Sequence, residues 1–445
     1  MKNIAILAVS VLTFSTVNKT YAQHNSITSL DTLSIDHTDK AGSYQLMFED
    51  NFSKAGKINA KDWLYRNNVK MGGVSWPQNV VQGKATDGSG EDCLLIKFTY
   101  DGSKAEGQQY LGGGVVSAHN FGYGYYEARV KLYGGSKELA GLHQSFWSMG
   151  LTGTNEAEGK GVRDHLTSTG VIPKENRVLE IDGFEHNSLN DKLAQNYHIY
   201  TPTHKSKAPE PESTHRDLSK WITMAYEWLP DRINFYCDGK YISTKHLDSI
   251  WKVYAPQNLW LTALPVDVAA WGGLKKPAEN AAMQVDYVRY YAKVLPGVNR
   301  IGNGSFDYGK AKNTYPIAWI VDPKKDSNAV TVVSDSISSQ SGKGYLFFKA
   351  DKAYKASVRQ TVAFIPDGNY TFGAWIKSSG GQKDASIIVK TGNKEQVIAL
   401  RESANWEKVV IPMVKVVNNQ AVIEIRCTGD AGQWLVVDNV SFTNF

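Results

Sequence analysis

Three carboxylates fall within six residues in the stretch Glu-Ile-Asp-Gly-Phe-Glu that begins at Glu180. Apolar residues precede and separate them, which indicates a strand in a packed sheet rather than a solvated acidic loop. Residues two apart on a strand share a face, so Glu180 and Asp182 should point the same way. Glu185 would face the opposite side unless a β-bulge adds one residue, and Gly183 is a suitable place for one.

With such a bulge the two glutamate backbones would lie about 14–16 Å apart, at roughly 3.3 Å per residue. If both side chains lean inward, their carboxyl groups would be separated by roughly 5–6 Å, close to the spacing in a retaining glycoside hydrolase. In that mechanism one carboxylate attacks the sugar and the other protonates the leaving oxygen. The same spacing of acidic residues also occurs as surface charge on an exposed edge, so the rest of the chain must decide.

The chain has 445 residues, enough for two or three domains of ordinary size. Its 12 Trp and 23 Tyr, together with 39 Gly, suit a β-rich protein that handles carbohydrate. The formal net charge is only +5, and no segment shows the clustered Lys and Arg of a nucleic-acid binder. We therefore expect no nucleic-acid partner.

The first 22 residues have the pattern of an export signal. Lys2 precedes an apolar run from Ile4 to Phe14, and Ala22 ends a short polar segment at which cleavage is expected. The apolar run is too short to remain as a membrane anchor, and no other run approaches membrane length. We expect no membrane span and a secreted, periplasmic or cell-surface protein, with residues 23–43 as a flexible lead-in.

The three cysteines, Cys93, Cys237 and Cys427, are far apart and lack a metal-binding spacing such as C-x-x-C. An exported protein could join Cys93 to Cys237 in a disulfide. Buried free thiols are the state that we expect.

Residues 44–294 contain many short β-strand patterns and almost no helical periodicity. From Tyr126 to Leu132, apolar residues alternate with Glu127, Arg129 and Lys131, which predicts an antiparallel strand with one polar face. The pattern restarts after residues 295–300, a predicted linker, and continues through residues 301–445. The sequence thus predicts an all-β protein, with one β-sandwich followed by a second, smaller one.

The larger half resembles glycoside hydrolase family 16 in a series of motifs that spans residues 44–293. The segments that carry the resemblance are Phe48 to Phe52, Gly122 to Lys131, Ser145 to Trp147, Glu180 to Glu185, Glu227 to Ile233, Tyr236 to Lys240 and Val285 to Tyr291. The resemblance implies a concave jelly-roll sandwich with an open cleft, and retaining hydrolysis of internal β-linkages in a polysaccharide.

By position in these motifs, Glu180 resembles the family's nucleophile, Glu185 its general acid/base, and Asp182 the carboxylate between them. Glu185 must be protonated when substrate arrives, and neighbouring negative charge favours that state. The chemistry needs no cofactor.

Aromatic rings stack on the apolar faces of sugars, so Trp147 and Trp271 are candidates for binding substrate, with Trp76 as a third. His198 resembles a histidine that the family often places beside the acid/base. Packing in the core is the alternative for each of the four residues.

Residues 150–176 form an insertion that is longer than in the family's simpler glucanases. Arg163, together with Lys160 and Lys174, could bind the sulfate groups of a galactan, although a charged loop is usually only solvated. This insertion favours a β-galactan such as agar, porphyran, carrageenan or a host galactoside. A β-1,3-glucanase of the laminarinase kind or a transglycosylase is the enzymatic alternative, and a non-catalytic lectin is the alternative outside enzymes.

The family often carries a structural calcium, for which Asp286 is the predicted ligand and Glu49 a weaker one. Residues 301–445 resemble a carbohydrate-binding module of the family 4/9 type. The carrying segments are Asn303 to Phe306, Trp319, Gly368 to Lys377 and Val436 to Phe442. Phe372 and Trp375 are expected in its core, and the domain either tethers the enzyme to polysaccharide or is a structural companion. We expect a monomer.

Overall fold

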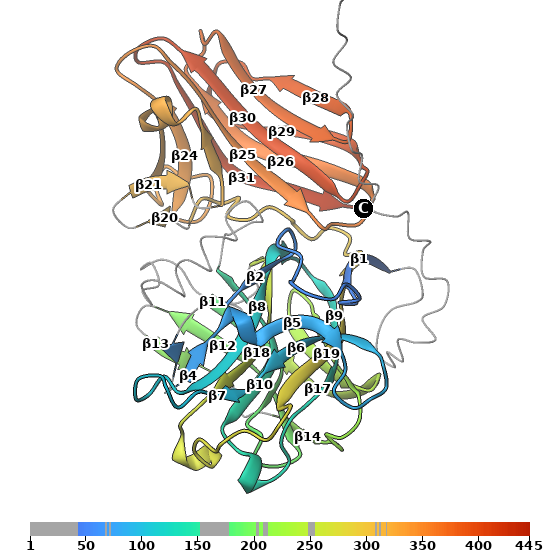
Figure 1. Ribbon diagram of the computed structural model, residues 1–445. Helices are drawn as coiled ribbons and strands as arrows, with labels where there is room; N and C mark the ends of the chain where they lie inside the picture. Colours follow the sequence, from blue (N-terminus) through green and yellow to red (C-terminus); the bar gives the residue numbers. More distant parts are fainter. Residues whose placement is uncertain are drawn as a thin grey trace, which may run out of the picture.

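The computed structural model describes residues 43–66, 69–70, 73–151, 178–201, 204–207, 212–247, 254–307, 309–310, 313–316 and 318–445. The predicted signal peptide (1–22), nearly all of the predicted lead-in (23–43) and most of the insertion (150–176) lie outside these residues. The described chain folds into two β-sandwiches, one of which sits on the other (Figure 1). Within the described ranges, no helix has the length and apolarity that a membrane span requires.

The first sandwich consists of two large sheets, which confirms the predicted all-β fold. One sheet has eight strands in the order β17-β16-β15-β9-β19-β6-β5, with β1 paired to β19. Its strands are β1 (Tyr44–Asp50), β5 (Val80–Lys84), β6 (Asp92–Lys97), β9 (Gly124–Lys131), β15 (Ile222–Trp228), β16 (Arg232–Cys237), β17 (Lys240–His246) and β19 (Ala282–Lys293).

The other sheet has eleven strands in the order β13-β12-β11-β10-β18-β8-β4-β3, with β14 paired to β12 and both β2 and β7 paired to β8. Its strands are β2 (Trp63–Tyr65), β3 (Val69–Lys70), β4 (Gly73–Ser75), β7 (Thr99–Tyr100), β8 (Tyr110–Phe121), β10 (Leu142–Leu151), β11 (Val178–His186), β12 (Lys192–Thr201), β13 (His204–Lys207), β14 (Glu212–His215) and β18 (Gln257–Pro265). Short 3₁₀ turns are η2 (Pro77–Asn79), η3 (Lys137–Leu139) and η6 (Ala269–Trp271).

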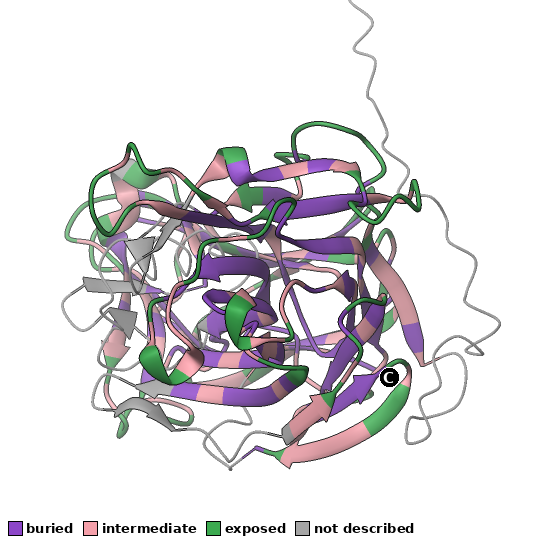
Figure 2. Ribbon diagram, turned by 60° about the horizontal axis from the view of Figure 1, so that its bottom comes forward, coloured by how far each residue is buried: buried purple, intermediate pink, exposed green. Residues whose placement is uncertain are grey.

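The core lies between these two sheets, where alternate residues of each strand meet. On β9, Tyr126, Ala128 and Val130 are buried as the alternation predicts. The predicted polar face is wrong at Glu127, which is only 5% exposed. Tyr125 and other aromatic side chains cover this part of the outer face, so the carboxylate of Glu127 is enclosed with a guanidinium 3.7 Å away. Figure 2 shows the buried strands inside a rim of exposed loops.

The second sandwich packs two five-stranded sheets around its own core, in the orders β22-β25-β30-β27-β28 and β23-β24-β31-β26-β29. Its strands are β22 (Ile320–Asp322), β23 (Val330–Ser334), β24 (Gly344–Lys349), β25 (Tyr354–Ala363), β26 (Gly368–Ser378), β27 (Asp384–Thr391), β28 (Lys394–Ala399), β29 (Ser403–Val416), β30 (Gln420–Gly429) and β31 (Trp434–Asn444), preceded by the short hairpin β20 (Gly309–Lys310) and β21 (Asn313–Pro316) and interrupted by η7 (Lys324–Ala329).

Two side chains on β26 differ in burial. Phe372 is buried in the core, as predicted. Trp375 is only half-buried, because it lies an odd number of residues from Phe372 and therefore points to the opposite face of the strand. The prediction that Trp375 belongs to the core is wrong.

The two sandwiches are in direct contact. Arg300, which is 2% exposed, donates from Nη2 to the carbonyl oxygen of Lys293 at 2.8 Å, and its backbone N–H donates to Phe442 O at 3.0 Å. Phe364 of the second sandwich packs against the core of the first. Residues 295–300, the predicted linker, are therefore hydrogen-bonded to both sandwiches.

The three cysteines are free and buried, as expected. Burial raises the pKa of the Cys93 thiol to about 12 and that of Cys237 to about 11. These thiols are therefore protonated at neutral pH and poorly nucleophilic.

Candidate active site

The acidic stretch forms strand β11, and the structure confirms the bulge at Gly183. On the β10 side, Phe146 pairs with Phe184 and the next residue pairs with Asp182, so Gly183 is the extra residue. The pairing with β12 shifts between Asp182 and Glu185 in the same way. The bulge reverses the alternation after Asp182 and returns Glu185 to the face that carries Glu180.

The packing on the core side of β11 explains why residue 183 is a glycine. A Cβ atom on Gly183 would lie 2.8 Å from Cδ1 of Phe146 and 3.0 Å from Cδ1 of Tyr226. Both aromatic side chains are fully buried, with ring centres 5.6 Å apart. The strand can therefore bulge toward the core only where no side chain is present.

The three carboxylates differ in exposure. Glu180 and Glu185 are half-buried on the outer face of the sheet, whereas Asp182 is 1% exposed. Asp182 lies between its strand neighbours Trp147 on β10 and Asn196 on β12. A carboxylate held this deeply is fixed in direction, which suits a residue that orients its neighbours rather than one that attacks substrate.

His198 on β12 lies opposite Glu180 in the strand pairing and contacts Asp182. Its Nε2 is 3.4 Å from Oδ2 of Asp182. Burial lowers the pKa of His198, while the negative charge of Glu185 acts in the opposite direction. The imidazole is therefore neutral at pH 7 and can exchange hydrogen bonds with the carboxylates.

Glu180, Asp182 and His198 are also the one group of three potential metal ligands among the described residues, with ligand atoms within 4.8 Å of one another. Acidic side chains are often grouped in this way without an ion, so this grouping alone assigns no metal to the site.

Arg66, which follows β2, supplies a positive charge close to Glu180. Its guanidinium lies 5.9 Å from the ring centre of Trp147 and 5.4 Å from that of Trp260. Burial lowers the pKa of Arg66 to about 10, and the negative charge of Glu180 opposes this effect. Arg66 thus stays charged at pH 7 and favours the ionised form of Glu180.

Trp147 is stacked on Trp260, with ring centres 4.8 Å apart and an angle of 18° between the planes. Its indole N–H donates to Thr262 Oγ1 at 3.1 Å. Trp147 is half-buried and pairs with Asp182, so the structure places it beside the trio rather than in the core, the alternative that the sequence left open.

Glu185 is in contact with a second histidine, His143 on β10. Nε2 of His143 lies 3.3 Å from Oε1 of Glu185. The imidazole stacks on the indole of Trp271, with ring centres 5.1 Å apart and an interplanar angle of 15°. Trp271, which sequence reasoning singled out, therefore reaches the trio through His143.

The other predicted site residues lie elsewhere. Trp76 precedes η2 near β4, which is separated from β11 by three strands, and its ring faces Lys104 Nζ at 4.4 Å. Arg163 lies outside the described residues. Sequence reasoning missed His143, Arg66 and Trp260. His143 could have been found from its spacing, because it lies four residues before Trp147 on an alternating strand and so shares its face.

Asp286, the predicted calcium ligand, lies on β19 in the other large sheet. Its carboxylate is paired with the guanidinium of Arg129, and Glu49 is paired with Arg289 at 2.7 Å. Calcium usually takes about 6–8 oxygen ligands. Two carboxylates that are each engaged by a guanidinium do not provide such a set, and we derive no step from calcium.

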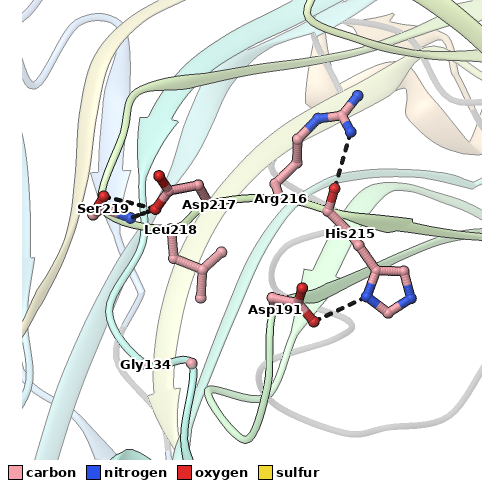
Figure 3. Close-up of a pocket in the computed structure, with 8 residues that line it drawn as sticks. Gly134, Asp191, His215, Arg216, Asp217, Leu218 and Ser219 are labelled. Atoms are coloured by element: carbon pink, nitrogen blue, oxygen red, sulfur yellow. Dashed lines mark hydrogen bonds and ion pairs between the residues drawn. The ribbon is translucent and has the colours of Figure 1, made fainter.

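A pocket of about 530 Å³ lies among residues that the sequence did not single out. The residues that line it are Gly134, Gly135, Asp191, His215, Arg216, Asp217, Leu218 and Ser219. In Figure 3, His215 contacts Asp191 and Ser219 contacts Asp217. None of the three carboxylates of β11 lines this pocket.

Comparison with known proteins finds a matching family model and several similar proteins. Residues 79–289 match the model of the family described as Glycosyl hydrolases family 16. A keratan-sulfate endo-1,4-β-galactosidase from Sphingobacterium multivorum is 24% identical over 363 residues, which are 78% of this chain and 74% of that protein. A β-glucanase from Acetivibrio thermocellus is 25% identical over 219 residues, which are 48% of this chain and 55% of that protein.

One solved structure, described as TmCBM61 in complex with β-1,4-galactotriose, is similar to part of this chain. It is 24% identical with a TM-score of 0.30, and the match covers 34% of this chain and 100% of that chain.

Proposed function

We propose that this chain is an exported, endo-acting β-glycoside hydrolase, because residues 79–289 match the model of glycosyl hydrolases family 16, a family of retaining O-glycosidases. It cleaves internal linkages of a polysaccharide by double displacement. The observation that carries the proposal is the bulge at Gly183, which puts Glu180, Asp182 and Glu185 on one face of β11.

In the first step, a carboxylate oxygen of Glu180 attacks the anomeric carbon, and Glu185 gives its proton to the departing glycosidic oxygen. In the second step, Glu185 takes a proton from water, whose oxygen replaces Glu180 on the anomeric carbon. Arg66 supports the ionised nucleophile, since its charge lies near Glu180. Asp182 is buried and contacts His198, and it keeps the neighbouring polar side chains in a fixed orientation.

The substrate that we propose is a β-galactan, of the agar, porphyran or carrageenan kind or a host galactoside. The similarity to a keratan-sulfate endo-1,4-β-galactosidase supports this choice, because it extends over 363 residues and therefore beyond the family 16 domain. A β-1,3-glucanase is the second candidate, supported by the similarity to β-glucanases. A transglycosylase would use the same residues with a sugar in place of water as the acceptor.

The test is release of reducing ends from purified agarose, porphyran, carrageenan, keratan sulfate, laminarin and mixed-linked glucan. Wild-type protein should cleave one of the galactans, and Glu180→Gln should lower that rate by a factor on the order of 10³ or more, because the amide cannot attack the anomeric carbon. Product analysis in water, with and without added oligosaccharide, separates hydrolysis from transglycosylation. Folded wild-type protein that cleaves none of the polymers would contradict the proposal and favour a lectin.

We further propose that the second sandwich binds the polysaccharide that the first one cleaves, and that the chain is exported as a monomer. Direct contact between the two sandwiches would then hold the bound polymer at a fixed distance from the carboxylates of β11.

A further inference from the structure

The acid/base of a retaining glycosidase must carry a proton in the first step and lack it in the second, so its hydrogen-bond partners matter for both. Glu185 has such a partner in His143, whose Nε2 lies 3.3 Å from Oε1. The register pairs Ser145 with Glu185, so His143 is the diagonal neighbour of Glu185 on the same face of the sheet.

The imidazole of His143 is held in place from two sides. Strand β10 is paired with β11 on one side and with β18 on the other, where His143 lies opposite Leu264. One face of the ring stacks on Trp271 at 5.1 Å between ring centres. A ring fixed by a central strand and by a stacked indole keeps Nε2 directed at Glu185 with little loss of entropy on substrate binding.

We propose that His143 is a positioning residue for the reaction, and that it donates its Nε2–H to Oε1 of Glu185. This inference rests on the proposed function of Glu185 as acid/base. A donor on Oε1 fixes the plane of the carboxyl group, and the proton that moves in the reaction is then carried by Oε2. Trp271 acts behind His143 by holding the ring.

Other charged and titratable groups also face Glu185. Glu180 and Asp182 lie on its own strand, and their negative charge favours the protonated form. His198 on β12 interacts with the negative charge of Glu185. From β10, His143 faces Glu185. The hydrogen bond that it donates favours the ionised form of Glu185, which is the opposite of the effect of the two carboxylates.

Two substitutions separate donation from packing. His143→Gln keeps an N–H donor and loses the aromatic stack, whereas His143→Phe keeps a ring for Trp271 and loses the donor. If His143 acts as a donor, the Gln variant should stay close to wild type, and the Phe variant should lose about 10- to 100-fold in kcat/KM. If His143 only packs on Trp271, the Phe variant should keep the higher kcat/KM and the Gln variant should have the lower one.

The pH profile of kcat/KM gives a second measurement. The alkaline limb reports loss of the proton from Glu185 in the free enzyme. Removing a donor to the ionised carboxylate should move this limb upward by about 1 pH unit in His143→Phe and leave it in place in His143→Gln. The matched control is His215→Phe, since His215 also contacts a carboxylate, that of Asp191 at 2.9 Å, and lies on β14, two strands from Glu185. An unmoved limb in His143→Phe would overturn the inference.

An NMR titration of the Glu185 side-chain carboxyl carbon, with ¹³C-labelled glutamate, does not depend on activity. The midpoint should rise in His143→Phe relative to wild type and to His143→Gln, and equal midpoints would overturn the inference. If wild-type protein cleaves no polysaccharide while this midpoint still shifts, the proposed function fails and the hydrogen bond stands.

Discussion

The two glutamates of β11 have different basic neighbours, and the difference matches the role that we propose for each. Glu180 has a guanidinium close by, that of Arg66, which stays charged across the working pH range. Glu185 has the imidazole of His143 at 3.3 Å. A permanent charge suits a carboxylate proposed to stay ionised, and a hydrogen-bond donor held on one oxygen suits a carboxyl group proposed to gain and lose a proton on the other.

His186, directly after Glu185, faces the other side of the strand and is 1% exposed. Its Nδ1 lies 3.2 Å from the carbonyl oxygen of Lys192. Burial lowers the pKa of His186 to about 4, from 6.5 in the unfolded chain. The folded state therefore resists a proton that the unfolded state accepts, so the stability that His186 contributes is present above pH 6.5 and is lost as the pH falls toward 4.

We expect the free energy of unfolding of wild-type protein, relative to His186→Gln, to fall by up to about 3 kcal/mol between pH 7 and pH 4. The glutamine removes the titration and keeps a polar group of similar size. Denaturant unfolding of both proteins at pH 7, 6, 5 and 4 measures the difference. A difference that stays constant over this range would mean that His186 titrates alike in the folded and unfolded chain.

The bulge of β11 depends on packing on the face opposite to the carboxylates, so a change on that face should move all three carboxylates. Gly183→Ala would place a methyl group 2.8 Å from Phe146 and 3.0 Å from Tyr226, two buried rings that have little room to move. We expect a loss of stability of about 1–3 kcal/mol and a loss of about 10²-fold or more in kcat/KM, because the strand must shift and Glu180 and Glu185 shift with it.

Gly83→Ala on β5 is the matched control, since its added Cβ would meet only Leu95 Cδ1 at an ordinary 3.8 Å. Thermal melts and initial rates on the cleaved polysaccharide measure both effects. A Gly183→Ala protein with unchanged melting temperature and activity would show that the bulge does not depend on a glycine.

The bulge and the shared face of the three carboxylates could be predicted, because they follow from the alternation of a single strand. The contacts that cross between strands could not. The spacing of His143 gives the face on which it lies, but its contact with Glu185 across β10 and β11, like that of Arg66 with Glu180 from the end of β2, depends on strand pairings that one sequence does not contain. The buried Glu127 was missed for the same reason, since aromatic residues from other strands cover it.

At the scale of the whole molecule, the two sandwiches share a packed interface. Phe364 lies with its ring centre 5.1 Å from that of His119 and 5.0 Å from that of Phe121 in the first sandwich. Its φ is 54°, in a region that aromatic residues rarely adopt. Asp367 adds a hydrogen bond from its backbone N–H to Gln45 Oε1 at 3.2 Å. A strained backbone that presents a ring to another domain indicates that the contact compensates for its cost.

The two sandwiches should therefore unfold together. We expect one calorimetric transition for the full chain. Phe364→Ala should remove about 1–3 kcal/mol of the free energy that couples the two sandwiches and should separate the transition into two, because the Phe364 ring packs against the core of the first sandwich. The control is Phe445→Ala, where the side chain is 65% exposed. Two separate transitions already in wild-type protein, or a single unchanged one in Phe364→Ala, would show that the interface carries no such coupling. A coupled transition that splits in the variant would mean that the second sandwich holds a fixed orientation, so that any polysaccharide on it is presented to β11 at a constant distance rather than at the end of a flexible tether.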